Sequence, residues 1–439
     1  MKLKTFAGGL HPPDNKEWTA HKSIETCPLP EELVVAMSQH IGAPAVPCVE
    51  VGQRVLRGEM IGAPKGFVSV PVHAPTSGEV VAIEPRPHPM GSPLPAVVIR
   101  ADGEDCWCES LAGTESDELE PEDIVERIRL AGVVGMGGAT FPTHVKLTPP
   151  VDKPIDTLVL NGVECEPYLT ADHRLMLEQQ QRLLQGISLI RRALGVKRAV
   201  IGIEANKPDA ITQLTALGRD VGVEVEPLAV KYPQGAEKQL IQVVTGRQVP
   251  SGGLPMDVGV VVQNVATAVA VADAVISGRP LIERVCTVTG AAVGEPKNLL
   301  IRIGTPLRHI IDFCGGLVEE PGKVVLGGPM MGFAQADLDL PALRGTSGLL
   351  LLSKAQVNLR PESPCIRCAR CVGACPMNLL PTTISAYGRN GLLAEAEEYR
   401  ALDCIECGCC SYTCPACISL VQAIRQAKAA ILASKRNKV

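Results

Sequence analysis

The sequence predicts a multidomain chain with a β-rich domain, an α/β domain, a small β-grasp-like unit and a helical iron–sulfur module. Residues 1–110 are rich in Pro, Gly and Val, and strands alternate with helices across residues 120–280. Eight cysteines then repeat one spacing near the carboxyl end. A chain of 439 residues is long enough for several domains. We predict the other two domains at residues 281–340 and 355–439.

The composition excludes several classes of protein. A net charge of −5 and an aromatic content of 3% argue against nucleic-acid binding. The 17 cysteines form no disulfide framework, which indicates a reducing compartment. The amino terminus has no apolar signal-peptide core. Polar residues such as Gln263 and Asp273 interrupt the longest apolar stretch, Val258–Ile276, so we expect no transmembrane span.

The first domain is expected to be a β-sandwich. The runs Val49–Ile61 and Val72–Val81 alternate apolar and polar residues around turn glycines. They resemble the flattened barrel-sandwich of lipoyl and biotinyl carrier domains. Those carriers modify a lysine at a hairpin tip, whereas here only Lys65 lies near the expected hairpin, Gly66–Pro71, and no carrier motif surrounds it. We therefore predict a structural role for this domain.

The α/β domain is predicted from alternating strands and helices after a first helix at Pro121–Ala131. Short connections between them indicate a parallel sheet covered on both faces, with ligands beyond the carboxyl ends of the strands. The expected strands are Ile155–Leu160, Ala199–Ile203, Val223–Val230 and Val258–Val262, and the expected helices are Ala171–Leu194, Pro208–Leu217, Gly235–Val244 and Ala266–Ile276.

The β-grasp-like unit and the end of the chain are simpler. We expect strands at Arg284–Thr289, Leu299–Ile303 and Lys323–Leu326, with a helix at Pro306–Cys314. A last helix runs from Ser419 to about Ser434 and carries a basic tail.

The eight cysteines form two frames of the pattern C-x2-C-x2-C-x3-C-P, which is the spacing that wraps a [4Fe-4S] cluster. Three cysteines of a frame bind one cluster, and the cysteine before proline binds the other. Zinc is disfavoured because it uses two separated C-x2-C pairs and no third in-frame cysteine. The first ligand set is thus Cys365, Cys368, Cys371 and Cys414, and the second ligand set is Cys404, Cys407, Cys410 and Cys375.

A second site is predicted at the strand ends of the α/β domain. A glycine-rich segment, residues 135–146, ends in Lys146, and such a segment brings backbone amides and a cation close to a phosphate or a flat ring. Asn161, Glu164 and Glu166 follow one strand. Asn264 and Thr267 follow another, although they would also serve as an ordinary helix cap. Together these clusters indicate a ligand pocket.

Two one-electron clusters need an electron source. A flavin accepts two electrons as a hydride and releases them singly, so it suits the interface between a nicotinamide and a cluster. An α/β domain that precedes the clusters therefore suggests a flavin site.

The motifs resemble those of a known family. Gly135-x-Gly-Gly-Ala-x-Phe-Pro-Thr-x-x-Lys146, Asn161-x-x-Glu164-x-Glu166-Pro167 and Asn264-Val-x-Thr267 are similar to the flavin- and NADH-binding subunit of respiratory complex I. The Thr5–Pro13 segment, the Tyr232–Lys238 segment and the two-cluster module resemble the RnfC family, the C subunits of the Rnf ion-translocating oxidoreductase complex, more closely. Met136, Thr140, Val163 and Cys165 depart from the complex I pattern.

This resemblance implies NADH stacked on FMN, with electrons passing to two [4Fe-4S] clusters. It implies NAD(H)- and ferredoxin-linked ion transport, as a peripheral subunit on the cytoplasmic face of the bacterial inner membrane, with the other subunits as partners and ferredoxin as an indirect one. It places Glu164 and Glu166 in the catalytic pocket. The implied cofactor-binding residues are Gly135, Gly137, Gly138, Phe141, Lys146, Asn161, Tyr232, Glu237, Asn264 and Thr267.

Two alternatives stay open at this point. A diaphorase-type subunit of a hydrogenase or dehydrogenase would use the same chemistry without ion transport. A two-cluster relay would have lost its flavin. Flavin absorbance of the reconstituted protein separates the second alternative from the first.

Overall fold

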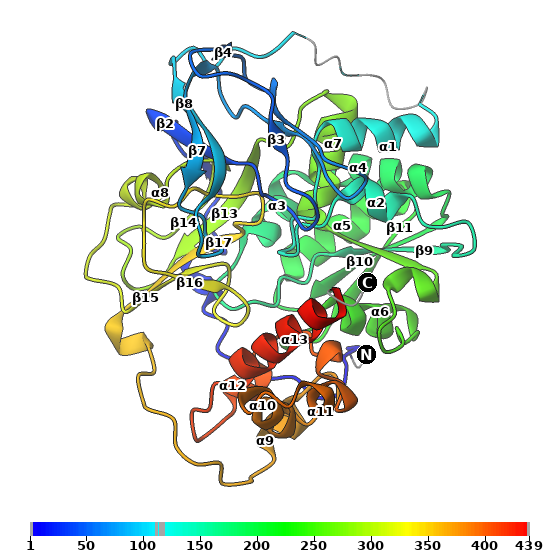
Figure 1. Cartoon of the computed structure of the whole chain (residues 1–439). Helices are drawn as coiled ribbons and strands as arrows, with labels where there is room; N and C mark the ends of the chain where they lie inside the picture. Colours follow the sequence, from blue (N-terminus) through cyan, green and yellow to red (C-terminus); the bar gives the residue numbers. More distant parts are fainter. Residues whose placement is uncertain (1–2, 110–112, 114–118, 437–439) are drawn as a thin grey trace.

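The computed structural model describes residues 3–109, 113 and 119–436, so the predicted limits 1, 110 and 439 lie outside the described residues. Figure 1 shows a β-rich part at the top, an α/β part on the right, a second sheet on the left and a helical part in orange and red at the bottom. These four parts are the fold class that the sequence predicts, which is therefore confirmed.

The β-rich part is a sandwich of two small sheets, ordered β2-β8-β7-β4 and β3-β5-β6. Apolar side chains such as Val35, Ile61 and Val97 fill the space between them. Strands β5 and β6 pair in antiparallel fashion across the expected hairpin. The strands are β2 Glu32–Ala36, β3 Val46–Pro47, β4 Arg54–Val55, β5 Met60–Ala63, β6 Val72–His73, β7 Gly78–Arg86 and β8 Leu94–Ala101.

The hairpin between β5 and β6 packs on the α/β part. The ring of Phe67 lies edge-on to His144, with 5.7 Å between ring centroids, and the Nε2 of His144 lies 3.0 Å from the carbonyl oxygen of Phe67. A carrier lysine must swing freely between sites, whereas this hairpin is held by a neighbouring domain. The contact supports a structural role for the sandwich.

The α/β part has a four-stranded parallel sheet in the order β11-β10-β9-β12. Residues of β9 alternate between two cores, because Leu158 and Leu160 pack with helices α4 and α7 while Val159 packs with α6 and Phe6. Both faces are thus covered. The strands are β9 Thr157–Asn161, β10 Arg198–Glu204, β11 Val223–Leu228 and β12 Val260–Asn264. The helices are α1 Pro121–Leu130, α2 Thr143–Leu147, α3 Ala171–Glu178, α4 Gln180–Leu194, α5 Pro208–Asp220, α6 Glu237–Thr245 and α7 Val265–Ile276.

The predicted single helix Ala171–Leu194 is wrong, because the chain bends at Gln179 and forms α3 and α4. The two helices have different packing partners. Helix α3 begins at the strand ends, where the carboxylate of Glu164 accepts hydrogen bonds from its first amides. Helix α4 lies against α7 so closely that a Cβ on Gly186 would be 1.7 Å from the carbonyl oxygen of Ala268. One straight helix would not satisfy both contacts.

The second sheet has six strands in the order β1-β14-β13-β17-β15-β16. Strand β1 comes from the amino-terminal segment, and β17 follows the predicted range 281–340, so this sheet draws strands from outside that range. The elements are β1 Ile24–Thr26, β13 Glu283–Thr289, β14 Lys297–Arg302, α8 Leu307–Phe313, β15 Lys323–Leu326, β16 Phe333–Gln335 and β17 Gly348–Leu352.

The cysteine-rich part is built from short helices and one long helix, α13. The apolar face of α13 is buried, with Ile424, Ala427 and Ile431 packed on α10 and α11. Three of its cations are paired as well, since Arg425 and Lys428 contact Glu406, and Lys435 contacts Glu397. The helices are α9 Arg370–Ala374, α10 Pro381–Arg389, α11 Leu393–Glu398, α12 Cys409–Tyr412 and α13 Leu420–Arg436.

No helix among the described residues combines the length and the apolar character needed to cross a membrane.

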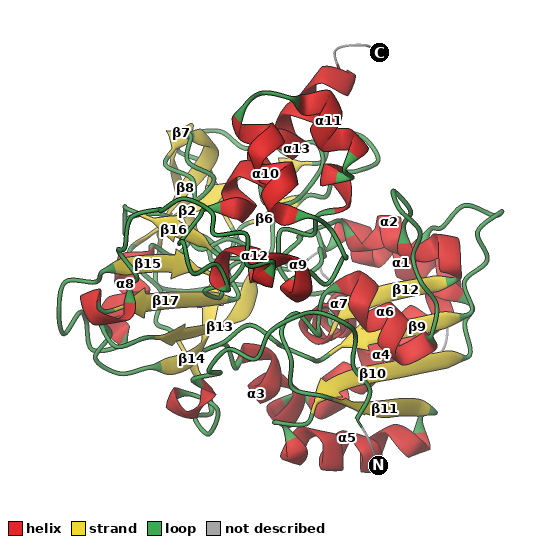
Figure 2. Cartoon of the chain, turned by 90° about the horizontal axis from the view of Figure 1, so that it is seen from below, coloured by secondary structure: helices red, strands yellow, loops and turns green. Residues whose placement is uncertain are grey.

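The amino-terminal segment joins the cysteine-rich part to the α/β part. Leu10 and Tyr232 exchange backbone hydrogen bonds, and the amide of Gly9 donates to the carbonyl oxygen of Ala374. In Figure 2, α9 and α12 lie between the α/β sheet and the six-stranded sheet. The two cysteine frames are therefore held against the other parts of the chain.

Candidate functional site: a cysteine cavity beside a glycine loop

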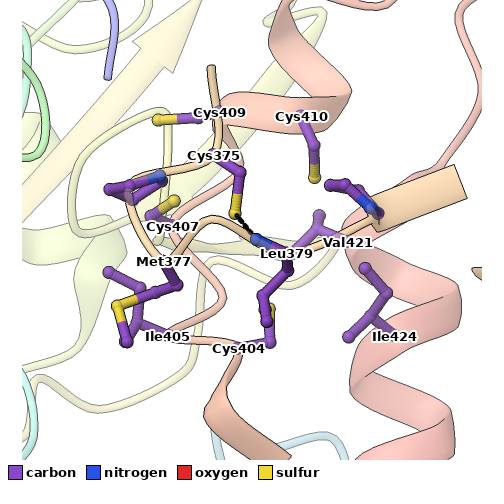
Figure 3. A pocket seen from close by; sticks show the side chains of 13 residues that line it. Cys375, Met377, Leu379, Cys404, Ile405, Cys407, Cys409, Cys410, Val421 and Ile424 are labelled. Atoms are coloured by element: carbon purple, nitrogen blue, oxygen red, sulfur yellow. Dashed lines mark hydrogen bonds between the residues drawn. The ribbon is translucent and has the colours of Figure 1, made fainter. Parts of the chain in front are cut away.

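Four cysteines from both frames line one cavity. Figure 3 shows Cys375, from the first frame, with Cys404, Cys407 and Cys410 from the second. The cavity has about 350 Å³ of empty space, part of it open to solvent, and its remaining lining is largely apolar. These four residues are the second ligand set predicted from the sequence.

The cysteines of the cavity suit a bound metal group. Burial raises the pKa of Cys404 to about 11 and that of Cys410 to about 12, so thiolates in this cavity need bound cations to offset their charge. The four cysteines therefore fit a [4Fe-4S] cluster.

The first ligand set lies in different surroundings. Cys365 and Cys368 are exposed, whereas Cys371 is buried. Cys371 and Cys414 pack in one apolar cluster with Leu420 of α13. Cys414, the predicted ligand that the second frame contributes to this set, thus lies near Cys371.

The glycine-rich segment forms a tight loop at the carboxyl edge of the parallel sheet. The amide of Gly135 donates to the carbonyl oxygen of Phe141, and the amide of Met136 donates to Oγ1 of Thr267 at 2.9 Å. Gly137 and Gly138 are exposed. Gly138 has a φ of 111°, which favours glycine, and the space beside it is open.

Polar groups of neighbouring strands surround this loop. Asn161 and Asn264 are register partners at the ends of β9 and β12. A Cβ on Gly137 would contact the side chain of Asn264 at 3.2 Å, so glycine permits this approach. The ammonium group of Lys146 lies 2.9 Å from the carboxylate of Glu237. The exposed loop glycines and the lysine fit a flavin phosphate and ring. The side chains of Asn161 and Asn264 donate to Gly235 and Asp172.

The two predicted catalytic carboxylates make structural hydrogen bonds. Glu164 accepts from the amides of Asp172 and His173, at 2.8 and 3.2 Å. Glu166 accepts from the amides of Met330 and Met331, at 3.1 and 2.9 Å, and burial raises its pKa to about 7. Their catalytic role stays a prediction.

Asp172 is not singled out by the sequence, although it lies in this group. One of its carboxylate oxygens lies 2.7 Å from Nδ2 of Asn264. Burial, together with the nearby charge of Glu164, raises the pKa of Asp172 to about 7. In the sequence, Asp172 is marked only by its place in the first turn of the helix after the Glu164 loop. Acids are common at that position because they interact favourably with the helix dipole, so the place alone does not indicate a site residue.

Tyr232 joins the α/β part to the cysteine cavity. Its ring is buried, and its hydroxyl donates a hydrogen bond of 2.8 Å to the carbonyl oxygen of Cys407. Tyr232 packs in one apolar cluster with Cys407, Cys409 and the partly buried Cys165. It follows strand β11 as predicted, but its hydroxyl points to the cysteine cavity.

Four family descriptions match successive parts of the chain. They read "RnfC Barrel sandwich hybrid domain" for residues 4–104 and "Nuo51 FMN-binding domain" for residues 128–273. They continue with "SLBB domain" for residues 285–334 and "4Fe-4S dicluster domain" for residues 358–415. The FMN and [4Fe-4S] assignments are thereby supported, and the limits of the domains stay predictions.

The chain also matches relatives over most of its length. It is 53% identical to the C subunit of a proton-translocating ferredoxin:NAD+ oxidoreductase complex from Clostridium ljungdahlii, over 91% of this chain and 88% of that one. It is 50% identical to the C subunit of a Na+-translocating ferredoxin:NAD+ oxidoreductase complex from Acetobacterium woodii, over 100% and 99%. The C subunit of an ion-translocating oxidoreductase complex from Rhodobacter capsulatus is 44% identical, over 88% and 75%.

A solved structure shares the fold at low identity. It is an NAD+-reducing [NiFe]-hydrogenase in the H2-reduced state, with a TM-score of 0.51 and 20% identity over 72% of this chain and 66% of that one. That likeness concerns the fold alone, whereas the relatives above extend over nearly the whole sequence. The chain therefore belongs to the RnfC family, the C subunits of Rnf-type, ion-translocating ferredoxin:NAD+ oxidoreductase complexes.

Proposed function

We propose that this chain is the subunit through which NAD(H) exchanges electrons with an ion-translocating ferredoxin:NAD+ oxidoreductase complex. The observation that carries the proposal is the contact between the strand ends of the α/β domain and the cavity of the second ligand set, through Tyr232. Electron transfer is fast only between centres that lie close together. The buried contact through Tyr232 supports such proximity between the two sites.

The α/β domain holds the flavin in this proposal. Gly135, Gly137 and Gly138 offer backbone, and Lys146 offers a cation, at the same edge of the sheet. FMN, when bound, accepts two electrons as a hydride and releases them one at a time. The proposed cofactor residues are Gly135, Gly137, Gly138, Phe141, Lys146, Asn161, Tyr232, Glu237, Asn264 and Thr267, with Glu164 and Glu166 in the nucleotide pocket.

The two ligand sets lie in series. The second set borders Tyr232 and Cys165. The first set lies beyond it, since Cys371 packs with Cys410 on the side of Leu420, and it ends in the exposed Cys365 and Cys368. This packing supports a path from the α/β domain to the second set, then to the first set and the surface.

The other subunits of the complex are the proposed partners, and ferredoxin is linked through them. The relatives that match this chain over most of its length are themselves parts of such complexes. We assign this chain as a peripheral subunit on the cytoplasmic face of the bacterial inner membrane, where NADH is found.

An anaerobic titration tests the proposal. NADH added to the flavin- and cluster-loaded chain should bleach the flavin absorbance first and the cluster absorbance afterwards. Dithionite provides the control, because it reduces both centres without a nucleotide site. If dithionite reduces both centres of fully flavin-loaded protein and NADH reduces neither, the chain is a relay and the nucleotide binds elsewhere.

A further inference from the structure

The segment that carries the first frame forms an exposed basic and apolar surface. Leu359 is 80% exposed and Ile366 is 68% exposed. Arg360, Arg367 and Arg370 are exposed around them. We call these five residues the first-frame surface. They flank Cys365 and Cys368, two exposed ligands of the first set.

The arginines of this surface are not neutralised. Glu362 is the one acid between residues 358 and 371, and its carboxylate is held by Arg389 at 2.9 Å and by the amide of Ser419 at 2.7 Å. Within the part of the chain that the structure describes, Arg360 contacts only Asn358 through its side chain, and Arg367 and Arg370 have no carboxylate partner. A chain of net charge −5 thus carries three arginines without a carboxylate partner beside the first ligand set.

The surface is fixed in position. The amide of Ser363 donates to the carbonyl oxygen of Ala416, and the side-chain amide of Asn358 lies 3.6 Å from Sγ of Cys417. Together with Glu362, these contacts attach the segment to the second frame and to α13. A fixed surface costs less ordering entropy on binding than a free loop.

We propose that the first-frame surface docks an electron-transfer protein or subunit whose own one-electron centre is surrounded by acidic residues. The proposal rests on the proposed function and adds the place where electrons leave or enter the chain. One electron moves per encounter, so the reduced cluster of the first set loses one electron and the centre of the partner gains it. Oxidation of one NADH to NAD+ and a proton supplies two such transfers.

Charge and apolar exposure have separate roles in this docking. Long-range attraction between arginines and carboxylates speeds encounter by about 10- to 1000-fold at low ionic strength. Leu359 and Ile366 then provide apolar area at the centre of the contact, where interface energy is concentrated.

An anionic lipid surface is the weaker candidate. Lipid-bound segments are commonly amphipathic helices with a free apolar face. Here the basic helix α13 buries its apolar face and pairs three of its cations, and residues 358–369 form no helix.

The test uses the full chain loaded with flavin and clusters, reduced by dithionite, and membranes that hold the remaining subunits but lack this one. The variant is Arg360→Gln, Arg367→Gln and Arg370→Gln together. The matched control is Lys65→Gln, Lys197→Gln and Arg219→Gln, which removes three charges from exposed positions elsewhere. The measurement is the rate of cluster reoxidation by the membranes at low and high salt.

We expect the triple variant to be reoxidised about tenfold more slowly than wild type at low salt, with most of the salt dependence lost. The control should match wild type, and replacement of the three arginines by lysine should restore the rate. Equal rates for the triple variant and wild type would overturn the proposal. Equal iron content excludes loss of the cluster as the cause.

Two further measurements distinguish protein docking from lipid binding and from a failed nucleotide site. If flotation with phosphatidylglycerol vesicles depends on the three arginines while reoxidation does not, the surface binds lipid and the proposal is wrong. Because dithionite supplies the electrons, docking is measured even if NADH fails to reduce the chain. Failure of the proposed function and failure of this inference are therefore distinguishable.

Discussion

The two cysteine frames have one spacing in the sequence and two environments in the structure. Cys404, Cys407 and Cys410 lie around a cavity beside the α/β domain, with Tyr232 bonded to Cys407. Cys365 and Cys368 lie at the surface, among unpaired arginines. The motif thus specifies which thiolates can bind a cluster, and the surroundings specify which neighbour can exchange electrons with it. Four changes test this contrast.

The largest effect is expected from Cys375→Ala. Cys375 lines the cavity of the second ligand set, so its loss should remove the cluster of that set and spare the cluster of Cys365. Iron content should fall by about half, and the EPR signal of one cluster should disappear. Cys409→Ala is the control, because Cys409 lines the same cavity outside both frames and should keep all the iron. Loss of the Cys365 cluster alone would contradict the crossed assignment.

Lys146→Ala should empty the site upstream of both frames without affecting either cluster. A phosphate that loses a charge-assisted partner binds with about 1.5–3 kcal/mol less free energy, which is about 10- to 100-fold weaker. Flavin content after gel filtration should fall while iron content stays constant. Lys153→Ala is the control, because Lys153 pairs with Asp257 before the amino ends of β9 and β12 and its loss should leave flavin bound. Normal flavin content in Lys146→Ala would remove Lys146 from the flavin site.

Tyr232→Phe should weaken the contact between the α/β part and the second ligand set, a contact that the first set lacks among the described residues. The change leaves the carbonyl oxygen of Cys407 without its hydroxyl donor and should lower the free energy of unfolding by about 1 kcal/mol. Anaerobic thermal denaturation measures this loss. Tyr412→Phe, at a residue that is 55% exposed, should have no effect. Equal melting of the two variants would mean that the bond to Cys407 contributes nothing.

The smallest effect is expected from Glu362→Gln, at the exposed first frame. Hydrogen bonds from Arg389 and Ser419 lower the pKa of Glu362 from its ordinary value of about 4.5 to about 2. The ionised Glu362 therefore holds the segment fully above pH 4.5, and this stabilisation is lost as the pH falls toward 2. The variant should mimic that loss at neutral pH. Hydrogen exchange should then accelerate at Ser363, whose amide bonds to Ala416, and stay unchanged at Leu10. Unchanged exchange at Ser363 would show that Glu362 does not fix the segment.

The sequence determined the class of each domain, and its motifs together identified the family. Cysteine spacing is local, so it predicts eight cluster ligands. The strand Thr157–Asn161 agrees with its predicted bounds within two residues because its apolar run is continuous. The pattern of Ala171–Leu194 predicts one helix because no proline or glycine marks the bend at Gln179. That bend comes from packing on α7 and on the strand ends.

Only the tertiary structure decided how the parts meet. The sheet that contains β13 recruits β1 from more than two hundred residues away, and the short run Ile24–Thr26 carries no pattern strong enough to predict it. The bond from Tyr232 to Cys407, and the use of Glu166 by the amides of Met330 and Met331, likewise join residues far apart in the sequence. Ligand chemistry follows from residue types at short spacing, whereas burial and exposure depend on long-range packing. For that reason two identical frames acquired different environments, with Cys365 and Cys368 exposed and Cys407 and Cys410 buried.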